Sequence, residues 1–164
     1  MGGLYGKLNL PGKGIGQDDL YASTLGMTLK FTDWLAFKSE GYFGAGLNKL
    51  QGGPSQTTGN ATLTATSKAL PVKGGFMELT YNPVKKAEVN LGYGIDDVNE
   101  DMTAVDRAAG TAVWDTNSTY YSNLKYSLSK DLLVGVEYQM FNTKWLDGVK
   151  AHDQRIETSV IYKF

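Results

Sequence analysis

The final stretch of the chain, residues 154–164, alternates strictly between two kinds of side chain. Every second position is aromatic or β-branched, and these positions are Ile156, Thr158, Val160, Tyr162 and Phe164. The positions between them are Arg155, Glu157, Ser159, Ile161 and Lys163, and the three charges of the strand are among them. A period of two is that of a β-strand, whose successive side chains point to opposite faces. One face of this strand must therefore meet an apolar environment, while the other meets water or countercharges.

Seven earlier segments repeat this alternation, with turn residues between them. They are residues 4–10, 20–31, 35–47, 75–82, 87–95, 119–128 and 132–143. The connections at 32–34, 83–86 and 129–131 are short, whereas those at 11–19, 51–74, 96–118 and 144–153 are long. Because short and long connections follow one another in turn, the strands should run up and down with all the short turns at one end. The sequence therefore predicts an all-β fold with one domain over 1–164, an antiparallel up-and-down β-barrel of eight strands; whether this is a transmembrane β-barrel or a soluble one depends on which face carries the charges.

Composition excludes several other classes of protein. No apolar run reaches the length of a membrane helix, but membrane strands need only about ten alternating residues. The chain has no cysteine, which excludes disulfide scaffolds and cysteine nucleophiles. Its 16 basic and 17 acidic residues give a net charge of −1, so there is no electrostatic case for a nucleic-acid partner.

The positions that alternate with the apolar ones carry charges of both signs. They are Lys7, Lys30, Lys38, Glu40, Glu78, Glu88, Lys125, Glu137, Arg155, Glu157 and Lys163. The opposite positions are apolar, with aromatic residues such as Phe31 and Tyr81 close to the short turns. In a membrane barrel the apolar face meets lipid, aromatic residues gather at the interfaces, and charges face the lumen. These eleven residues are therefore the candidate lumen lining.

Several segments resemble the last strands of Gram-negative porins, a family of outer-membrane β-barrels. They are Tyr93–Asp97, Asn123–Leu128, Leu133–Tyr138 and the terminal Tyr162–Phe164. In that family the barrel-assembly machinery reads the terminal aromatic residue, so the resemblance assigns an assembly signal to Tyr162 and Phe164. It also implies a place in the bacterial outer membrane, with the lipid bilayer and lipopolysaccharide around the protein and small hydrophilic solutes as its cargo. Homo-oligomerisation is left open.

The number of strands leaves two architectures open. Porins usually have about 16 to 18 strands, roughly twice the number that this sequence predicts. The chain is therefore either a small eight-stranded barrel or similar to the C-terminal half of a larger porin.

The sequence holds no strong candidate for a catalytic, cofactor or metal site. His152 is the only histidine and falls in a predicted loop, which argues against a catalytic triad or a multi-histidine metal site. Gly12–Gly16 lacks the spacing of a phosphate-binding loop. The acidic segment Asp96–Asp101 offers hard oxygen ligands without the spacing of a known calcium loop, so calcium binding there is left open. We expect no enzymatic activity, no cofactor and no metal centre.

Three functions fit these patterns. The first is a channel that passes small hydrophilic solutes or ions through a charge-lined lumen. The second is a structural or adhesive barrel, because eight strands leave room only for side chains and buried lysines and glutamates would have to pair and plug the interior. The third is a soluble lipocalin-like carrier, with the apolar side chains inside. The resemblance favours the channel.

Overall fold

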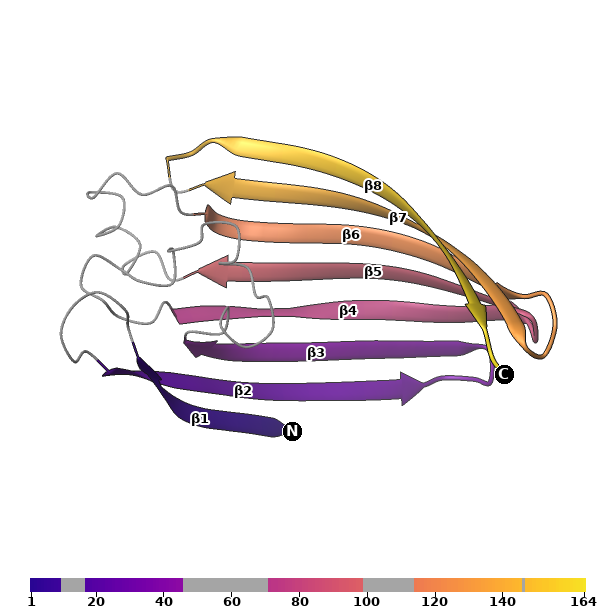
Figure 1. The fold of residues 1–164 in the computed structure, drawn as a ribbon, viewed down its shortest axis with the longest axis horizontal. Helices are drawn as coiled ribbons and strands as arrows, with labels where there is room; N and C mark the ends of the chain where they lie inside the picture. The colour runs from indigo at the N-terminus through magenta and orange to yellow at the C-terminus, as the bar shows by residue number, and fades with distance from the viewer. Residues whose placement is uncertain (10–16, 46–70, 99–113, 146) are drawn as a thin grey trace.

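The computed structural model describes residues 1–9, 17–45, 71–98, 114–145 and 147–164, and all of its regular structure is β-strand (Figure 1). The strands are β1 (Gly2–Asn9), β2 (Gln17–Lys30), β3 (Leu35–Ala45), β4 (Pro71–Val84), β5 (Ala87–Val98), β6 (Trp114–Ser127), β7 (Leu132–Trp145) and β8 (Lys150–Tyr162). No helix among the described residues has the length and hydropathy needed to cross a membrane.

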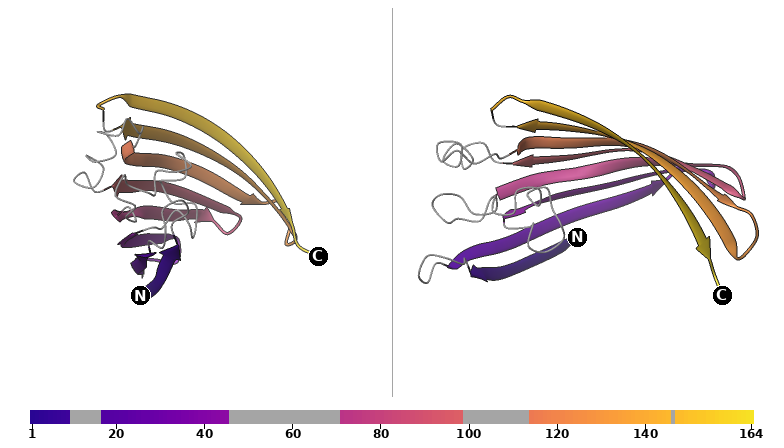
Figure 2. Two further views of the ribbon diagram at one scale, coloured as in Figure 1. Left: turned by 60° about the vertical axis from the view of Figure 1, so that its left-hand side comes forward. Right: turned by 45° about the horizontal axis from the view of Figure 1, so that its top comes forward.

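The strands form one sheet in the order β1 to β8, and every neighbouring pair is antiparallel. This confirms the predicted all-β, up-and-down arrangement. The sheet is twisted and curved (Figure 2). Among the described strands no pairing joins β1 to β8, so each of them leaves one edge open. Such an edge carries unpaired backbone donors and acceptors and is a template for another strand.

The turns between β2 and β3, β4 and β5, and β6 and β7 lie at one end of the sheet, on the right of Figure 1, where the C-terminus also lies. Between β2 and β3 the amide of Trp34 donates to Thr32 Oγ1 at 3.2 Å. Between β6 and β7, Ser129 Oγ accepts from the amides of Asp131 and Leu132 at 3.2 and 3.1 Å. Hydroxyl side chains close both turns by accepting hydrogen bonds from these backbone amides.

The connection between β7 and β8 is shorter than predicted. A long loop was expected at 144–153, but β7 continues to Trp145 and β8 begins at Lys150. Gly148 has a φ of 88°, and its amide donates to the carbonyl of Trp145 at 2.9 Å. Because glycine adopts this left-handed conformation without a steric penalty, a tight hairpin forms where sequence patterning indicated a loop. His152 consequently lies on β8 rather than in a loop.

Other strands also continue further toward the long connections than predicted. β4 begins at Pro71 and β6 at Trp114, whereas 75 and 119 were expected. In this region Lys73 and Asp97 lie opposite each other and form a 3.1 Å ion pair, so charge appears on a face that is apolar elsewhere. The alternation in hydropathy therefore stops before the strand does. Gly12–Gly16 and the remainder of the predicted long loops at 51–70 and 99–113 lie outside the described residues.

The described part of the chain buries few apolar side chains. They are Leu20, Ala45, Val72 and Val98. Many large apolar residues are instead exposed along one face of the sheet, Leu25, Met77 and Leu91 among them. A stable sheet of this kind needs an apolar environment for that face, since so large an exposed apolar surface is unusual in a soluble monomer.

Candidate functional site

The opposite face, here called the polar face, carries rows of hydrogen-bonding side chains. A row is a set of residues that lie directly opposite one another on successive strands. The central row of the polar face consists of Thr28, Lys38, Glu78, Gly92, Tyr121, Gln139 and Arg155. Directly opposite residues share a face and have Cβ atoms close enough to interact. The register therefore brings groups from seven strands, far apart in sequence, into one line.

Glu78 is the centre of the first hydrogen-bonded group on this face. Its Oε1 accepts from Lys38 Nζ at 2.9 Å and from Thr80 Oγ1 at 3.1 Å, and its Oε2 accepts from Tyr121 Oη at 2.9 Å. These donors come from β3, β4 and β6, so one carboxylate on β4 links three strands. The Glu78 side chain is only 15% exposed, whereas that of Lys38 is 42% exposed.

A second hydrogen-bonded group runs across β5 to β8. Asn90 Nδ2 donates to Glu88 Oε1 and to Asn123 Oδ1, both at 2.8 Å, and Lys125 Nζ donates to Glu88 Oε1 at 2.9 Å. Asn123 Nδ2 in turn donates to Glu137 Oε2 at 2.9 Å. The group ends at Gln139, which donates to Glu137 and accepts from Arg155 Nη2 at 2.8 Å. Together these hydrogen bonds connect four strands.

The ion pairs in these groups stay in contact with solvent. Lys125 and Glu88 have side chains that are 46% and 35% exposed, and Lys38 is exposed to a similar degree. Pairs of this kind contribute only about 0–1 kcal/mol each, because water screens the attraction. These pairs therefore lie at the surface of the open sheet, although the Glu78 carboxylate itself is largely covered.

The exposed apolar residues on the other face form a band that crosses the rows obliquely. On β2 this band runs from Tyr21 to Leu29, and on β8 it runs from Ile156 to Tyr162. Leu25, the middle of the band on β2, shares a row with His152 on β8. The middle of the band on β8 is residue 159, which lies seven residues beyond His152 along that strand. The apolar band thus shifts by seven residues between β2 and β8.

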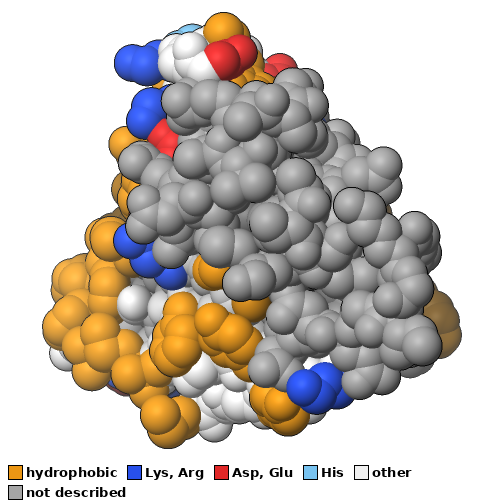
Figure 3. Space-filling model, turned by 90° about the vertical axis from the view of Figure 1, so that its left-hand side faces the viewer, with side chains coloured by type: hydrophobic (Ala, Val, Ile, Leu, Met, Phe, Trp, Pro, Cys, Tyr) orange, Lys and Arg blue, Asp and Glu red, His pale blue; other side chains and the backbone are white. Residues whose placement is uncertain are grey.

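This shift gives the inclination of the strands. Seven residues span about 23 Å along a strand, and six strand spacings span about 29 Å across the sheet. A band that lies level in a bilayer then requires strands inclined by about 40°, within the range of about 35–45° found in outer-membrane barrels. Figure 3 looks onto the end with the long connections: charged side chains gather at the top, toward β8, while hydrophobic side chains gather lower down, at the left.

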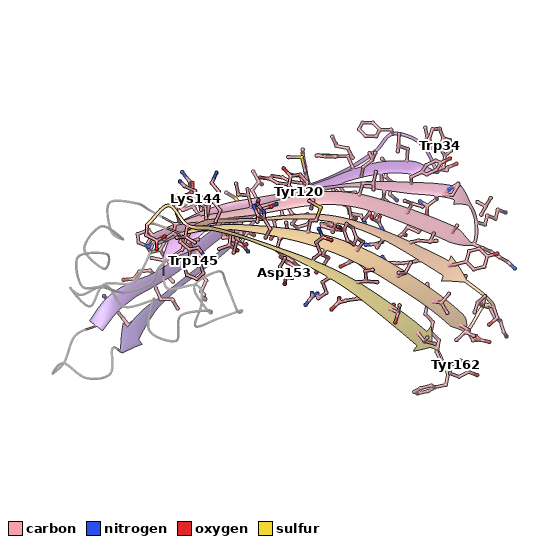
Figure 4. All side chains as sticks on the ribbon, turned by 90° about the horizontal axis from the view of Figure 1, so that it is seen from above. Trp34, Tyr120, Lys144, Trp145, Asp153 and Tyr162 are labelled. Atoms are coloured by element: carbon pink, nitrogen blue, oxygen red, sulfur yellow. The ribbon has the colours of Figure 1, made fainter. Side chains whose placement is uncertain are left out.

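Aromatic residues lie at the short-turn end of the apolar face. The ring of Trp34 meets that of Tyr81 edge-on at 5.8 Å between centroids, and the rings of Tyr162 and Phe164 are 6.4 Å apart. Trp34 and Tyr162 lie at one end of the sheet and Trp145 at the other (Figure 4). Amphipathic rings in this position suit the interface between lipid and water.

Comparison with known proteins agrees with this geometry. No protein-family model matches the sequence, and no curated protein matches it. The fold is similar to that of an outer-membrane channel. That structure is the outer membrane channel DcaP of Acinetobacter baumannii, with a TM-score of 0.71 and 18% sequence identity. The match covers 91% of this chain and 42% of the channel, so the chain spans less than half of that protein's length.

Most of the charged residues selected from the sequence share the polar face. They are Lys30, Lys38, Glu40, Glu78, Glu88, Lys125, Glu137, Arg155 and Glu157. Lys163 follows the last residue of β8, and its amide donates to the carbonyl of Asp131 at 2.8 Å. Tyr162 and Phe164, the candidate assembly signal, are both exposed at the short-turn end.

Lys7 differs from the sequence interpretation. β1 pairs with β2 so that Lys7 lies opposite Asp19 and Tyr5 lies opposite Tyr21, which puts Lys7 on the apolar side of the sheet. Leu4 lies opposite Ala22 and shares the polar face instead. The alternation within β1 defines two faces, but only the register with β2 decides which of them continues the polar face.

Several residues of the hydrogen-bonded groups were missed because only charged positions were selected. Asn90, Asn123 and Gln139 are uncharged but occupy the same alternating positions. The acidic segment also differs from expectation, because Asp96 and Asp97 belong to β5 rather than to a loop. Their side chains lie on opposite faces of the sheet: Asp96 accepts from Tyr42, and Asp97 pairs with Lys73. These two carboxylates therefore diverge, and no group suited to a metal ion occurs in the described residues.

Proposed function

We propose that this chain forms part of the wall of an outer-membrane channel that passes small hydrophilic solutes or ions. The observation that carries the proposal is the oblique apolar band on one face, set against a polar face with charges of both signs. In a bilayer the apolar face meets lipid, and the polar face meets a water-filled lumen. The similarity in fold to an outer-membrane channel supports the same conclusion.

The open edges support a wide pore made by more strands than these eight. β1 and β8 do not pair with each other, and strands placed along their free edges would continue the sheet without changing its topology. The match to 42% of a larger channel is consistent with a wall segment of this size. The other partners proposed for the chain are the lipid bilayer, lipopolysaccharide and the assembly machinery that would read Tyr162 and Phe164.

A closed eight-stranded barrel with a plugged interior is the second candidate. The pairs Lys38–Glu78 and Lys125–Glu88, both at 2.9 Å, are of the kind that it requires. It also requires a cation for every buried carboxylate, and among the described residues no cation pairs with Glu40 or Glu137. The soluble carrier is not favoured, because the crowded face is polar and includes Asn90, which is 1% exposed.

Recordings from planar bilayers test the channel. The purified protein, refolded in detergent so that its wall is closed, should give stable conductance steps whose size is reproducible. A folded and inserted sample that leaves the bilayer silent would contradict the proposal.

The absence of native cysteines allows a clean test of closure. One cysteine placed on β1 and one on β8 should not be linked to each other within one chain by a short bifunctional reagent if the sheet continues into a larger wall. Efficient linkage within one chain would favour the closed eight-stranded barrel.

A further inference from the structure

Two tyrosines on the polar face cross over a glycine and reach a carboxylate two strands away. Tyr121 on β6 crosses Gly92 on β5 and donates to Glu78 on β4 at 2.9 Å. In the same way Tyr42 on β3 crosses Gly74 on β4 and donates to Asp96 on β5. Ordinary cross-strand contacts join adjacent strands, so a contact that skips a strand needs free space over the strand between.

The two glycines provide that space. A Cβ atom at Gly92 would overlap the Cζ, Cε1 and Oη atoms of Tyr121. At Gly74 it would lie 2.7 Å from Tyr42 Oη and 2.5 Å from the carbonyl oxygen of Ile95. Both distances are too short for a carbon atom, so any other residue at these positions would displace the tyrosine or the backbone.

Gly94 shows that this requirement is local. It lies two residues from Gly92 on the same strand and the same face, yet the nearest atom to an added Cβ would be 3.7 Å away. That separation is an ordinary van der Waals contact. Gly94 is therefore a matched control for Gly92.

The contact from Tyr121 changes what Glu78 presents to the lumen. Lys38 and Thr80 occupy Oε1, and Tyr121 is the donor to Oε2, so both oxygens have partners. The carboxylate is mostly covered, with a side chain 15% exposed, while its partner Lys38 is 42% exposed. A solute that passes this row therefore meets the ammonium group and the phenol more directly than the carboxylate.

We propose that Tyr121, seated over Gly92, is a positioning residue that sets the charge preference of the pore by holding the Glu78 carboxylate against the wall. This inference rests on the proposed channel function. It adds that the central row controls whether the pore favours cations or anions. Releasing Glu78 exposes a negative charge near the path of the solute, which attracts cations and repels anions.

The reversal potential in a potassium chloride gradient measures this preference. Tyr121→Phe keeps the ring over Gly92 but removes the donor, and it should raise the ratio of potassium to chloride permeability. The expected rise is at most roughly sixfold, because one unit charge about 8 Å away in water attracts potassium by a factor of about 2.4 and repels chloride by the same factor. Gly92→Ala should shift the ratio in the same direction, and Gly94→Ala should leave it unchanged.

A double substitution separates positioning from a general disturbance of the barrel. If Tyr121 acts through Glu78, Tyr121→Phe should have no effect on the ratio when Glu78→Gln is already present. Variants that conduct normally, with Tyr121→Phe and Gly92→Ala indistinguishable from the wild type, would overturn the inference and leave the channel itself standing.

A wild-type protein that does not conduct would mean that the channel function has failed. The positioning can still be measured in that case, from the ¹³C chemical shift of the Glu78 carboxyl group in the refolded protein. This shift should differ between the wild type and Tyr121→Phe and should be unaffected by Gly94→Ala. Identical shifts in the wild type and Tyr121→Phe would overturn the inference.

Discussion

Asn90 and Leu91 are neighbours on β5, yet they have opposite surroundings. Asn90 is 1% exposed and donates to Glu88 and Asn123, whereas Leu91 is 53% exposed. In a soluble domain leucine is usually buried and asparagine exposed. The two faces therefore differ in where their partners come from: the amide nitrogen of Asn90 has both acceptors on the polar face, although its Oδ1 has no partner among the described residues, whereas the apolar face needs partners from outside the chain.

The largest expected effect comes from placing a charge on the apolar face. Met27 and Thr28 are adjacent on β2, and both are exposed, but they belong to the apolar and polar faces respectively. Met27→Arg should destabilise the protein by about 2–4 kcal/mol if the residue lies near the middle of the bilayer, because the charge would enter hydrocarbon. Thr28→Arg should cost much less, since its side chain reaches water. Denaturant unfolding of the protein refolded into vesicles measures both, and a larger cost at Thr28 would reverse the assignment of the faces.

A smaller effect should distinguish two carboxylates within the polar face. Glu78 accepts from three side chains, whereas Glu40 forms no ion pair among the described residues. Glu78→Ala should cost about 1–3 kcal/mol, because the donors lose a charged acceptor. Glu40→Ala should cost under about 0.5 kcal/mol, the usual range for a surface substitution. Equal costs in the same unfolding measurement would show that the Glu78 contacts do not stabilise the sheet.

The end of the apolar face should matter more for assembly than for stability. Phe164 is fully exposed, and its ring lies 6.4 Å from that of Tyr162. Deleting Phe164 should change the unfolding free energy by less than about 1 kcal/mol, since the side chain buries little area. The amount of protein in the outer membrane of expressing cells should nevertheless fall. An unchanged amount would remove the role of Phe164 as an assembly signal.

The smallest expected effect on stability comes from single cysteines that test the inclination of the strands. Met27 and Gln154 share a row, yet the oblique band includes only Met27. Single cysteines at these positions should change stability little, and fluorophores attached to them should differ in depth by about 18 Å, as strands inclined by about 40° require. A lipid-chain quencher should act on the label at 27, and a water-soluble quencher on the label at 154. Equal depths would mean that the strands stand upright in the membrane.

The local pattern of side chains was sufficient to predict that the strands exist and which side chains share each face. A side chain at every second position points the same way whatever the neighbouring strand is, so residues such as Glu137 and Val136 could be assigned to opposite faces from the sequence. The short turns at Thr32 and Ser129 could be recognised for a similar reason, because their hydroxyl groups bond to amides two or three residues away.

Patterning failed where the structure depends on contacts between distant segments. Lys7 was assigned to the wrong face because the two faces of β1 are distinguished only by its register with β2. The hairpin at Gly148 was read as a loop because charged residues on both sides of it conceal the strands. No local signal pairs Tyr121 with Glu78, which are 43 residues apart in the chain.

The sequence by itself determined that this protein has eight amphipathic strands in an up-and-down order, because hydropathy with a period of two and short turns are local properties. Only the tertiary structure decided which residues lie opposite one another, where the apolar band crosses the sheet, and that β1 and β8 stay unpaired. The physical reason is that register is a relation between strands: a shift of one residue exchanges the two faces without any change in the pattern of either strand.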